Sequence, residues 1–522
     1  MIIIYIKNRR VPYPTMGIPY YFYTLTKTYE NIISSKSPQH CDIYCIDFNG
    51  VIHNICAKML TALSRDERLD EDKLIKALYT KVIADIELLK PKKVYICVDG
   101  TVPLAKMMQQ RKRRYLTVYK NKIDGIQTKW DTNAITPGTK FMKKLDHYFK
   151  KQVRYNSMAT DIYYSGSDEY GEGEHKIFKK LEQASESDAI IINGLDADLI
   201  ILSLMCRCKN ITLMRESDCN QYLVVNNLRN AVIADLTLKW DITIGTSADE
   251  KDIIESYCVL CSLLGNDFIP HLLTLNLHNK SDRSLNKLIT FGGMSYKSFG
   301  PLVQSDTINY TALIDILQNI AKTEDRDIFE ETERYIKNVP NNRGVPSDLF
   351  GLKHKDPVAQ AIYNDLSKWR HTYYKHLFYT NTMIDTSVIN MACQNYIKGI
   401  YWTYAYYKQK CYDNEWYYPY GYPPTIRDIA NYVLGSEAPL PDASKNECSH
   451  LQKIQAMIVL PKESMSVVSA QAFDSVDSIV IDSIEHLYPS SYTIHTFLKT
   501  HLWECVPELP VINIKYITKH IR

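Results

Sequence analysis

Short apolar runs alternate with helix-forming segments between about residues 16 and 275. The runs at 43–46, 93–98 and 188–193 have the length and composition of buried strands. Between the first two, apolar residues recur at helical spacing and predict a helix over 72–90. Apolar strands separated by helices are typical of a parallel sheet covered on both faces. We therefore expect an α/β fold with a central, mostly parallel sheet in this half of the chain.

The pattern changes after about residue 300. It weakens between 300 and 360, where residues 341–346 favour a loop, and aromatic residues then become dense, with helices expected over 363–383 and 387–408. A chain of 522 residues also exceeds the usual size of one domain. We expect four segments: an N-terminal extension (1–15), a core (16–300), a linker (301–360), and a largely helical, aromatic-rich second region (361–522).

Carboxylates gather at the predicted ends of strands and at related turns. They are Asp47, Asp99, Glu172, Glu174, Asp196, Asp198 and Asp267. One such aspartate is often only a helix cap or part of a turn, but capping does not account for all seven. In parallel sheets ligands bind beyond the carboxyl ends of the strands, so acids far apart in the chain are expected to converge there. Oxygen ligands suit Mg²⁺, and metal pairs held by acids activate water in many nucleases.

A basic segment follows Asp99. If residues 104–114 are helical, Lys106, Gln110, Arg113 and Arg114 share one face. Taken alone, such a run is usually a solvated surface. Because it begins seven residues after a strand-end acid, this face can lie beside the metal site, where its amide and cations suit a terminal phosphate.

Two rings are candidates for stacking on nucleic-acid bases, which aromatic side chains do without reading sequence. His53 follows Asp47 by six residues, and Trp416 lies in an aromatic run. From the residues alone, a packed or solvent-facing histidine and a core tryptophan are the simpler interpretations.

The composition narrows the class of protein. A net charge of +3 does not indicate a molecule coated in positive charge, so any nucleic-acid surface must be local. The thirteen cysteines form no disulfide framework, and Cys258 and Cys261 lie in an apolar run that predicts a buried helix. No apolar stretch reaches membrane-spanning length. We expect a soluble intracellular protein with reduced thiols, in the cytoplasm rather than the nucleus, and no membrane partner.

Several motifs together resemble those of a known family. They are Met16 to Pro19, Asp47 to His53, Asp99 to Arg114, Asn133 to Thr139, Gly171 to Lys176, Gly194 to Leu202, Leu264 to Leu272, Trp416 to Pro424, and Trp503 to Pro510. In order and spacing the chain resembles the XRN-type 5′→3′ exoribonucleases over about residues 16–515.

This resemblance implies a PIN-like/FEN-like nuclease core with a second conserved region packed on it. It implies Mg²⁺-dependent removal of mononucleotides from single-stranded RNA with a 5′-monophosphate, using two ions, with Mn²⁺ as a possible substitute. The seven acids would be the catalytic metal ligands, the basic face (Lys106, Gln110, Arg113 and Arg114) would bind the 5′-phosphate, and His53 and Trp416 would stack on bases. A FEN-like DNA or flap nuclease and a non-catalytic RNA-binding scaffold are the alternatives.

The chain departs from the family pattern in places. Fifteen residues precede Met16, which suggests an inactive extension or a translation start at Met16. Asn414 stands where the family commonly has a first tryptophan, and Glu255-Ser256 where it usually has two aspartates. We also expect the long C-terminal modules of the large cytoplasmic enzymes to be lacking.

Overall fold

A computed structural model describes most of the chain. The described residues are 17–64, 66–123, 125, 128–194, 196–215, 221–245, 249–277, 282–337, 356–378, 385–439, 449–468 and 485–514. The proposed extension (1–15) and the loop predicted at 341–346 lie outside them.

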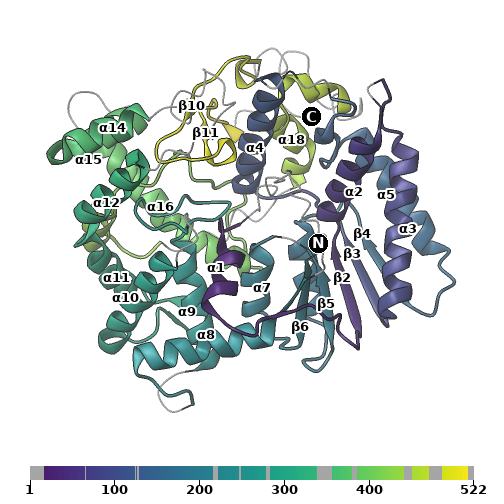
Figure 1. Ribbon diagram of the computed structural model, residues 1–522, viewed down its shortest axis with the longest axis horizontal. Coiled ribbons are helices and arrows are strands. Elements are labelled where there is room, and N and C mark those ends of the chain that lie inside the picture. The colour runs from purple at the N-terminus through teal and green to yellow at the C-terminus, as the bar shows by residue number, and fades with distance from the viewer. Residues whose placement is uncertain are drawn as a thin grey trace, which may run out of the picture.

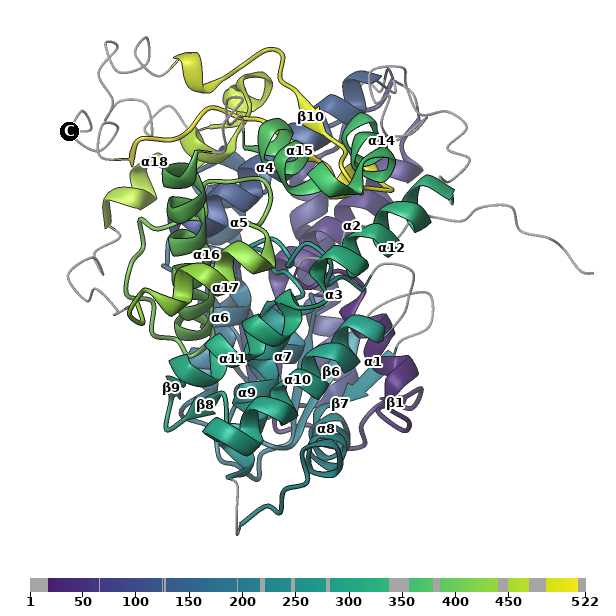
Figure 2. The same cartoon turned by 90° about the vertical axis from the view of Figure 1, so that its left-hand side faces the viewer.

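A seven-stranded mixed sheet forms the centre of the first region (Figures 1 and 2). Its order is β1-β7-β6-β5-β2-β3-β4. The strands are β1 (Ile33–Ser34), β2 (Ile43–Asp47), β3 (Lys93–Cys97), β4 (Asp161–Ser165), β5 (Ile190–Asn193), β6 (Ile211–Arg215) and β7 (Gln221–Val224). The run from β6 through β4 is parallel, and β7 is antiparallel to both β6 and β1. The predicted α/β class with a mostly parallel sheet is confirmed.

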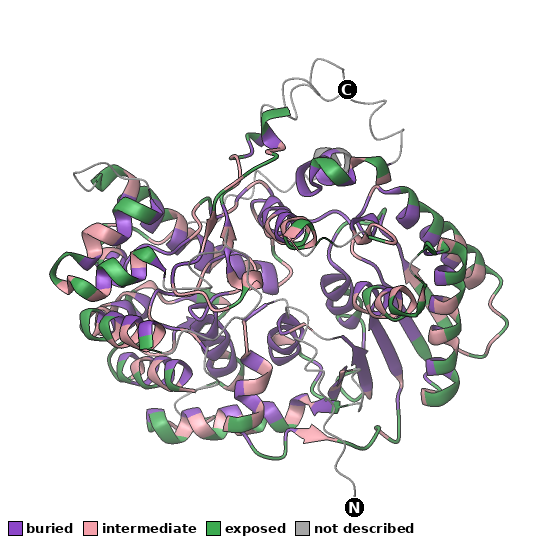
Figure 3. Cartoon of the chain, turned by 45° about the horizontal axis from the view of Figure 1, so that its top comes forward, coloured by how far each residue is buried: buried purple, intermediate pink, exposed green. Residues whose placement is uncertain are grey.

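Alternating side chains of the strands enter two different cores. From β2, Tyr44 and Ile46 pack with α2 (Phe48–Ala62), α3 (Glu71–Leu89) and α5 (Lys140–Arg154). Ile43 and Cys45 instead join the larger core on the other face of the sheet. That core includes residues of α1 (Tyr21–Thr28), α6 (Gly173–Leu181), α7 (Asp198–Met205), α8 (Val225–Trp240) and α9 (Glu250–Ser262). Because both faces are covered, the central strands β2 and β5 are buried along their whole length, whereas the edge strands β1 and β4 are partly exposed (Figure 3).

Helices dominate the rest of the chain. They are α4 (Leu104–Ile123), α10 (Arg283–Phe299), α11 (Tyr310–Ala321), α12 (Glu324–Lys337), α14 (Pro357–Asn364), α15 (Trp369–Leu377), α16 (Thr386–Tyr407), α17 (Ile426–Leu434) and α18 (Ser449–Val459). Short 3₁₀ turns are η1 (Thr132–Ala134), η4 (Leu366–Lys368), η5 (Lys462–Val467), η6 (Glu485–Leu487) and η7 (Leu502–Glu504). Two small antiparallel pairs, β8 (Val303–Gln304) with β9 (Thr307–Ile308) and β10 (Ile494–His495) with β11 (Val506–Pro507), complete the described elements. The second region is thus largely helical and aromatic-rich, as predicted.

The first part of the predicted linker, residues 301–337, is largely helical. The helices α11 and α12 occupy most of this stretch. Leu313, Ile316, Leu317 and Ile320 of α11 are fully buried at helical spacing. This stretch therefore has the apolar period of an amphipathic helix.

Helix α4 packs against the C-terminal part of the chain (Figure 1). Arg111 is fully buried in it. Its Nη1 donates to the carbonyl of Ile458 at 2.7 Å, and its Nη2 donates to the carbonyl of Leu487. One cation of the basic segment therefore has a structural role. In the sequence, Arg111 lies between Gln110 and Arg113, which belong to the predicted phosphate-binding face.

Candidate active site

Three adjacent parallel strands carry acids to one edge of the sheet. The neighbours β3, β2 and β5 end together. Asp47 is the last residue of β2, Asp99 follows β3 by two residues, and Asp196 follows β5 by three. Asp198 begins α7, which leaves the same edge. The convergence predicted from the apolar runs is thus present in the fold.

The start of α6 adds two more acids. Glu172 is the residue before the helix and Glu174 lies in its first turn. The Gly173 N–H donates to Asp99 Oδ1 at 2.8 Å. A Cβ at Gly173 would lie 2.7 Å from Asp47 Oδ1, so only glycine allows α6 to approach the strand ends this closely.

Asp267 completes the set of seven acids. It lies in the loop after α9, and its Oδ1 accepts a hydrogen bond from the Gly17 N–H at 3.0 Å. Gly17 has a positive φ of 81°, and a Cβ there would lie 2.4 Å from Asp198 Oδ1. This glycine therefore fits between two carboxylates that are distant in sequence.

Lys106 lies within the acid cluster. Its side chain is 2% exposed, and its Nζ forms salt bridges with Glu172 and, at 2.7 Å, with Asp267 Oδ2. Sequence reasoning assigned this lysine to a phosphate pocket next to the acids. In the structure it contacts two of them directly.

Burial and mutual repulsion shift the pKa values of most of these acids. Burial, followed by the charges of Asp196, Asp99 and Glu172, raises the pKa of Asp47 well above its usual value. For the same two reasons the pKa of Asp99, Glu174 and Asp198 is also raised. Burial is the main factor that raises the pKa of Asp196 to about 6. At Asp267 burial acts in the same direction, but Lys106, the Gly17 N–H and Arg113 together outweigh it, so the pKa is lowered.

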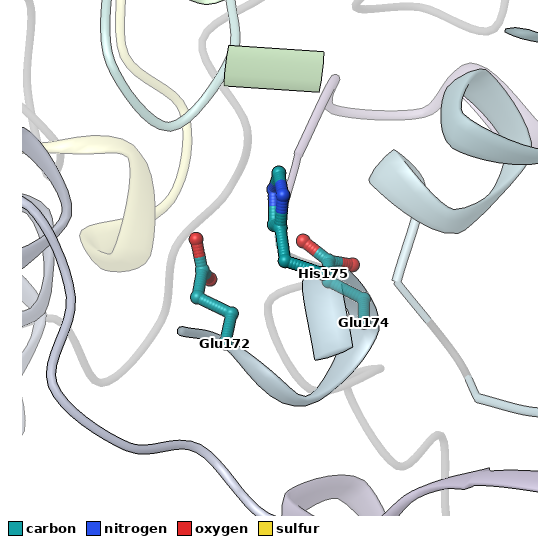
Figure 4. A group of neighbouring side chains, drawn as sticks. All are labelled: Glu172, Glu174 and His175. Atoms are coloured by element: carbon teal, nitrogen blue, oxygen red, sulfur yellow. The ribbon is translucent and has the colours of Figure 1, made fainter. Parts of the chain in front are cut away.

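The donor set fits a hard divalent cation. Glu174 Oε2 is buried and makes no hydrogen bond with any part of the chain that the structure describes. One ligand atom from each of Glu172, Glu174 and His175 lies within 4.8 Å of the others (Figure 4). Carboxylate oxygens in a buried, mutually repelling cluster are suited to Mg²⁺ or Mn²⁺.

The predicted basic face of α4 lies beside the acids. The charge of Arg113 acts on both Asp196 and Asp267. Gln110 is buried, and its Oε1 has no hydrogen-bond partner among the described residues. The Nη1 of Arg114 donates to Asn133 Oδ1 at 3.0 Å. Whether this face binds a phosphate stays a prediction.

The two candidate stacking rings differ in exposure. His53 is exposed on α2, near the positive charges of Arg113 and Arg114. Trp416 is only 6% exposed and packs on Trp402, with ring centroids 5.2 Å apart. The base-stacking role of each ring stays a prediction.

The two departures from the family pattern also have defined places. Asn414 is buried, and its Oδ1 accepts a hydrogen bond from the Tyr170 hydroxyl at 2.7 Å. Glu255 is buried in α9 and forms a salt bridge with Lys408 at 2.6 Å.

Sequence reasoning missed three residues at the site. His175 directly follows Glu174, and its Nδ1 lies 3.0 Å from the amide nitrogen of Gln409. The hydroxyls of Tyr406 and Tyr407 donate to Glu172 and Asp198. Adjacency to Glu174 was an available signal for His175. The two tyrosines lie more than 200 residues from the acids that they contact, so no local pattern identifies them.

Two sequence families match the chain. The family described as "XRN 5'-3' exonuclease N-terminus" matches residues 16–217, and "Xrn1 helical domain" matches residues 247–350 and 353–522. The chain belongs to the XRN family. The second match begins at residue 247, within the segment predicted as core, and extends through the segment predicted as linker, and the division of this XRN protein into four segments stays a prediction.

Curated relatives agree with this assignment. Human 5'-3' exoribonuclease 1 is 25% identical over 96% of the chain and 34% of its own length. The corresponding protein of Schizosaccharomyces pombe is 23% identical over 95% of the chain and 48% of its own length. The Drosophila melanogaster 5'-3' exoribonuclease 2 homolog is 24% identical over 97% of the chain and 70% of its own length. The chain therefore spans about a third to a half of the length of the first two relatives.

Solved structures give a more distant similarity. The T5 D15 protein co-crystallised with metal ions aligns with 54% of the XRN chain and 84% of its own, at 8% identity and a TM-score of 0.29. A T5 D15 flap endonuclease complex with DNA and metal ions aligns with 55% of the XRN chain and 92% of its own, at the same identity and TM-score. These similarities are too distant to define the chemistry of the site.

Two further expectations concern membrane-spanning helices and the state of the cysteines. In the described part of the chain, no helix combines the length and apolar character needed to cross a membrane. Cys258 and Cys261 are buried free thiols within α9, as the apolar run predicted.

Proposed function

We propose that this XRN protein is a divalent-metal-dependent 5′-3′ exoribonuclease that removes mononucleotides from 5′-monophosphorylated single-stranded RNA. The observation that carries the proposal is the convergence of seven carboxylates around one buried lysine: three from the ends of strands, three from the starts of two helices and one from a loop. A protein that only binds RNA gains nothing from so much buried negative charge.

The acids would hold the metal ions. Mg²⁺ bound there would activate a water molecule and stabilise the leaving oxygen of a phosphodiester. Hydrogen bonds within the chain hold two of the proposed ligands in place without a bound ion. Asp99 is held by the Gly173 N–H at 2.8 Å and by Asn49 Nδ2 at 2.8 Å, and Asp267 by the Gly17 N–H at 3.0 Å. Such preorganisation is what metal-assisted hydrolysis requires.

The basic face would select the RNA end. Gln110, Arg113 and Arg114 follow Lys106 on one side of α4, and Arg113 acts on the acids electrostatically. Arginine forks match the oxygens of a terminal phosphate. A phosphate held there would place the first phosphodiester of the strand at the carboxylates. The exposed His53 lies near the same arginines and would stack on a terminal base.

Matched oligonucleotides test this proposal. RNA and DNA of the same sequence, bearing a 5′-monophosphate, 5′-hydroxyl or 5′-triphosphate and a 3′ label, are incubated with the full chain in Mg²⁺ or in EDTA. We expect mononucleotide release from monophosphorylated RNA in Mg²⁺, and none in EDTA.

The other substrates separate the alternatives. Equal cleavage of hydroxyl and monophosphate ends would contradict an end-selecting pocket. Preferential cleavage of DNA or of a flap junction would favour a FEN-like nuclease. RNA binding without cleavage in Mg²⁺ or Mn²⁺ would favour a non-catalytic scaffold. The Asp161→Asn variant is a suitable control, because Asp161 is exposed at the opposite end of the sheet.

A further inference from the structure

Two consecutive tyrosines at the end of α16 contact two different acids of the cluster. The Tyr406 hydroxyl donates to Glu172 Oε1 at 2.6 Å, and the Tyr407 hydroxyl donates to Asp198 Oδ1 at 3.0 Å. Both tyrosines are buried. A phenol is protonated at neutral pH, so each hydroxyl has a proton to donate.

The two oxygens of Glu172 have separate partners. Oε1 accepts from Tyr406, and Oε2 forms the salt bridge with Lys106. A carboxylate contacted at both oxygens has a defined orientation. If an ion replaces the ammonium of Lys106 at Oε2, the phenol still holds Oε1 in place.

Tyr406 is itself rigidly packed. Its ring stacks on Trp402, with centroids 4.9 Å apart and planes at 14°, and contacts Phe268 at 5.2 Å and His175 at 3.9 Å. Such packing restricts where the hydroxyl can lie, as a group that orients a metal ligand requires. A phenol is also neutral, so it stabilises a carboxylate without repelling a cation bound to it.

We propose that Tyr406 and Tyr407 are positioning residues that orient Glu172 and Asp198 for divalent-metal binding, and through which the helical region controls the metal affinity of the nuclease core. The inference rests on the proposed function, since it takes these two acids to be metal ligands. Outer partners of metal ligands typically change metal affinity by about 10–100-fold when they are removed.

The same helix offers a matched control. The Tyr404 hydroxyl also donates to a buried carboxylate, that of Glu255. Glu255 is not one of the seven acids and is neutralised by Lys408. Tyr404→Phe therefore removes an equivalent phenol–carboxylate hydrogen bond from α16 without touching the proposed metal ligands.

The experiment compares Mn²⁺ binding by the full-length wild type, Tyr406→Phe, Tyr407→Phe and Tyr404→Phe. Affinity is measured by isothermal titration calorimetry and by the electron paramagnetic resonance signal of free Mn²⁺, and stability by thermal melting in EDTA. We expect Tyr406→Phe and Tyr407→Phe each to bind Mn²⁺ at least about tenfold more weakly, and Tyr404→Phe to bind like the wild type. Raising the Mn²⁺ concentration should also restore most of the lost RNA-cleavage rate.

The outcomes separate this inference from the proposed function. If the wild type binds no Mn²⁺, the proposed metal-dependent function fails first. If the wild type binds Mn²⁺ and both variants bind it equally well, the positioning role is overturned. An equal loss in Tyr404→Phe would overturn it too, because the tyrosines would then act only through the packing of α16. Should one variant fail to fold in EDTA, the other carries the test, since the two hydroxyls contact different acids.

Discussion

Lys106 Nζ lies 2.7 Å from Asp267 Oδ2 and also forms a salt bridge with Glu172, so this ammonium lies where a divalent cation would be expected between acids. Asp267, Glu172, Glu174 and Asp198 raise the pKa of Lys106 well above its usual value, although burial opposes them. The lysine is therefore charged, and it neutralises part of the cluster in the metal-free protein. Metal binding at these acids and the position of Lys106 must be coupled.

Lys106→Met should strongly destabilise the metal-free protein. Removing one partner of a buried ion pair leaves unpaired buried charge, at a cost of about 3–5 kcal/mol. Mg²⁺ should raise the melting temperature of this variant more than that of the wild type, because the ion supplies the missing positive charge. Melting in EDTA and in Mg²⁺ measures both effects.

The control for this substitution is Lys120→Met, at an exposed position in the last turn of the same helix. It should melt like the wild type in either condition. A Lys106→Met protein as stable as the wild type in EDTA would show that the ammonium does not balance the acids.

Asp196→Asn and Asp198→Asn should abolish cleavage but preserve the fold. Removing one charge from a repelling cluster should maintain or raise the melting temperature in EDTA. At the same time the stabilisation by Mg²⁺ should largely disappear. Asparagine still accepts the hydrogen bond that Tyr407 gives to Asp198. Turnover and melting with and without Mg²⁺ test the prediction, and near-normal turnover in both variants would reject the metal-ligand assignment.

The sequence was sufficient to locate the acids because each one follows a local signal. The apolar runs that became β2, β3 and β5 stop at or just before an aspartate, and parallel strands bring such ends together. The helix over α3 was also predicted within one residue at each end, since its apolar positions recur without interruption.

Other features depend on contacts between distant segments. Arg111 and Arg114 are close neighbours in α4, yet Arg111 donates to Ile458 while Arg114 donates to Asn133. No pattern within the basic run predicts that these two arginines contact different segments. Likewise, the aromatic density of α16 predicted a helix but not that Tyr406 would reach Glu172, because only the packing of α16 on the core brings them together.

Arg113→Ala should reduce the preference for 5′-monophosphate ends. Losing one charge-assisted contact to the phosphate costs about 1.5–3 kcal/mol, or roughly ten- to hundredfold in binding. The quantity to measure is the ratio of cleavage rates on monophosphate and hydroxyl ends. Lys120→Ala, on the same helix, should leave that ratio unchanged. An unchanged ratio in Arg113→Ala would mean that the basic face of α4 does not contact the RNA end.

A buried acid outside the cluster should make stability depend on pH. Glu324 is fully buried and accepts hydrogen bonds from the backbone N–H groups of Ile426 at 2.6 Å and Arg427 at 3.0 Å. Burial raises its pKa from 4.5 to about 7, although the two N–H groups oppose this. The folded state therefore binds the carboxyl proton of Glu324 more tightly than the unfolded state does. The stability that this adds is greatest below about pH 4.5 and is lost as the pH rises through 7.

Glu324→Gln should flatten this dependence, since the amide does not titrate. The wild type should lose up to about 3 kcal/mol relative to the variant between pH 5 and 8. Melting curves across this range provide the measurement. Glu333→Gln, which removes a surface ion pair with Lys337 on the same helix, should retain the wild-type profile. Parallel profiles for the wild type and Glu324→Gln would show that Glu324 stays ionised.

His53→Ala should slow stepping along the RNA more than it weakens initial binding. His53 is exposed on α2, near the positive charges of Arg113 and Arg114. Losing a base stack costs about 1–3 kcal/mol, so long RNA should give more partly shortened products while the chemistry at the acids persists. His53→Phe keeps a ring and should retain most of the wild-type product ladder. Thr61→Ala, exposed on the same helix, should change nothing. Because His53 is exposed, melting temperatures should stay constant in all three variants, and an unaltered ladder in His53→Ala would exclude the stacking role.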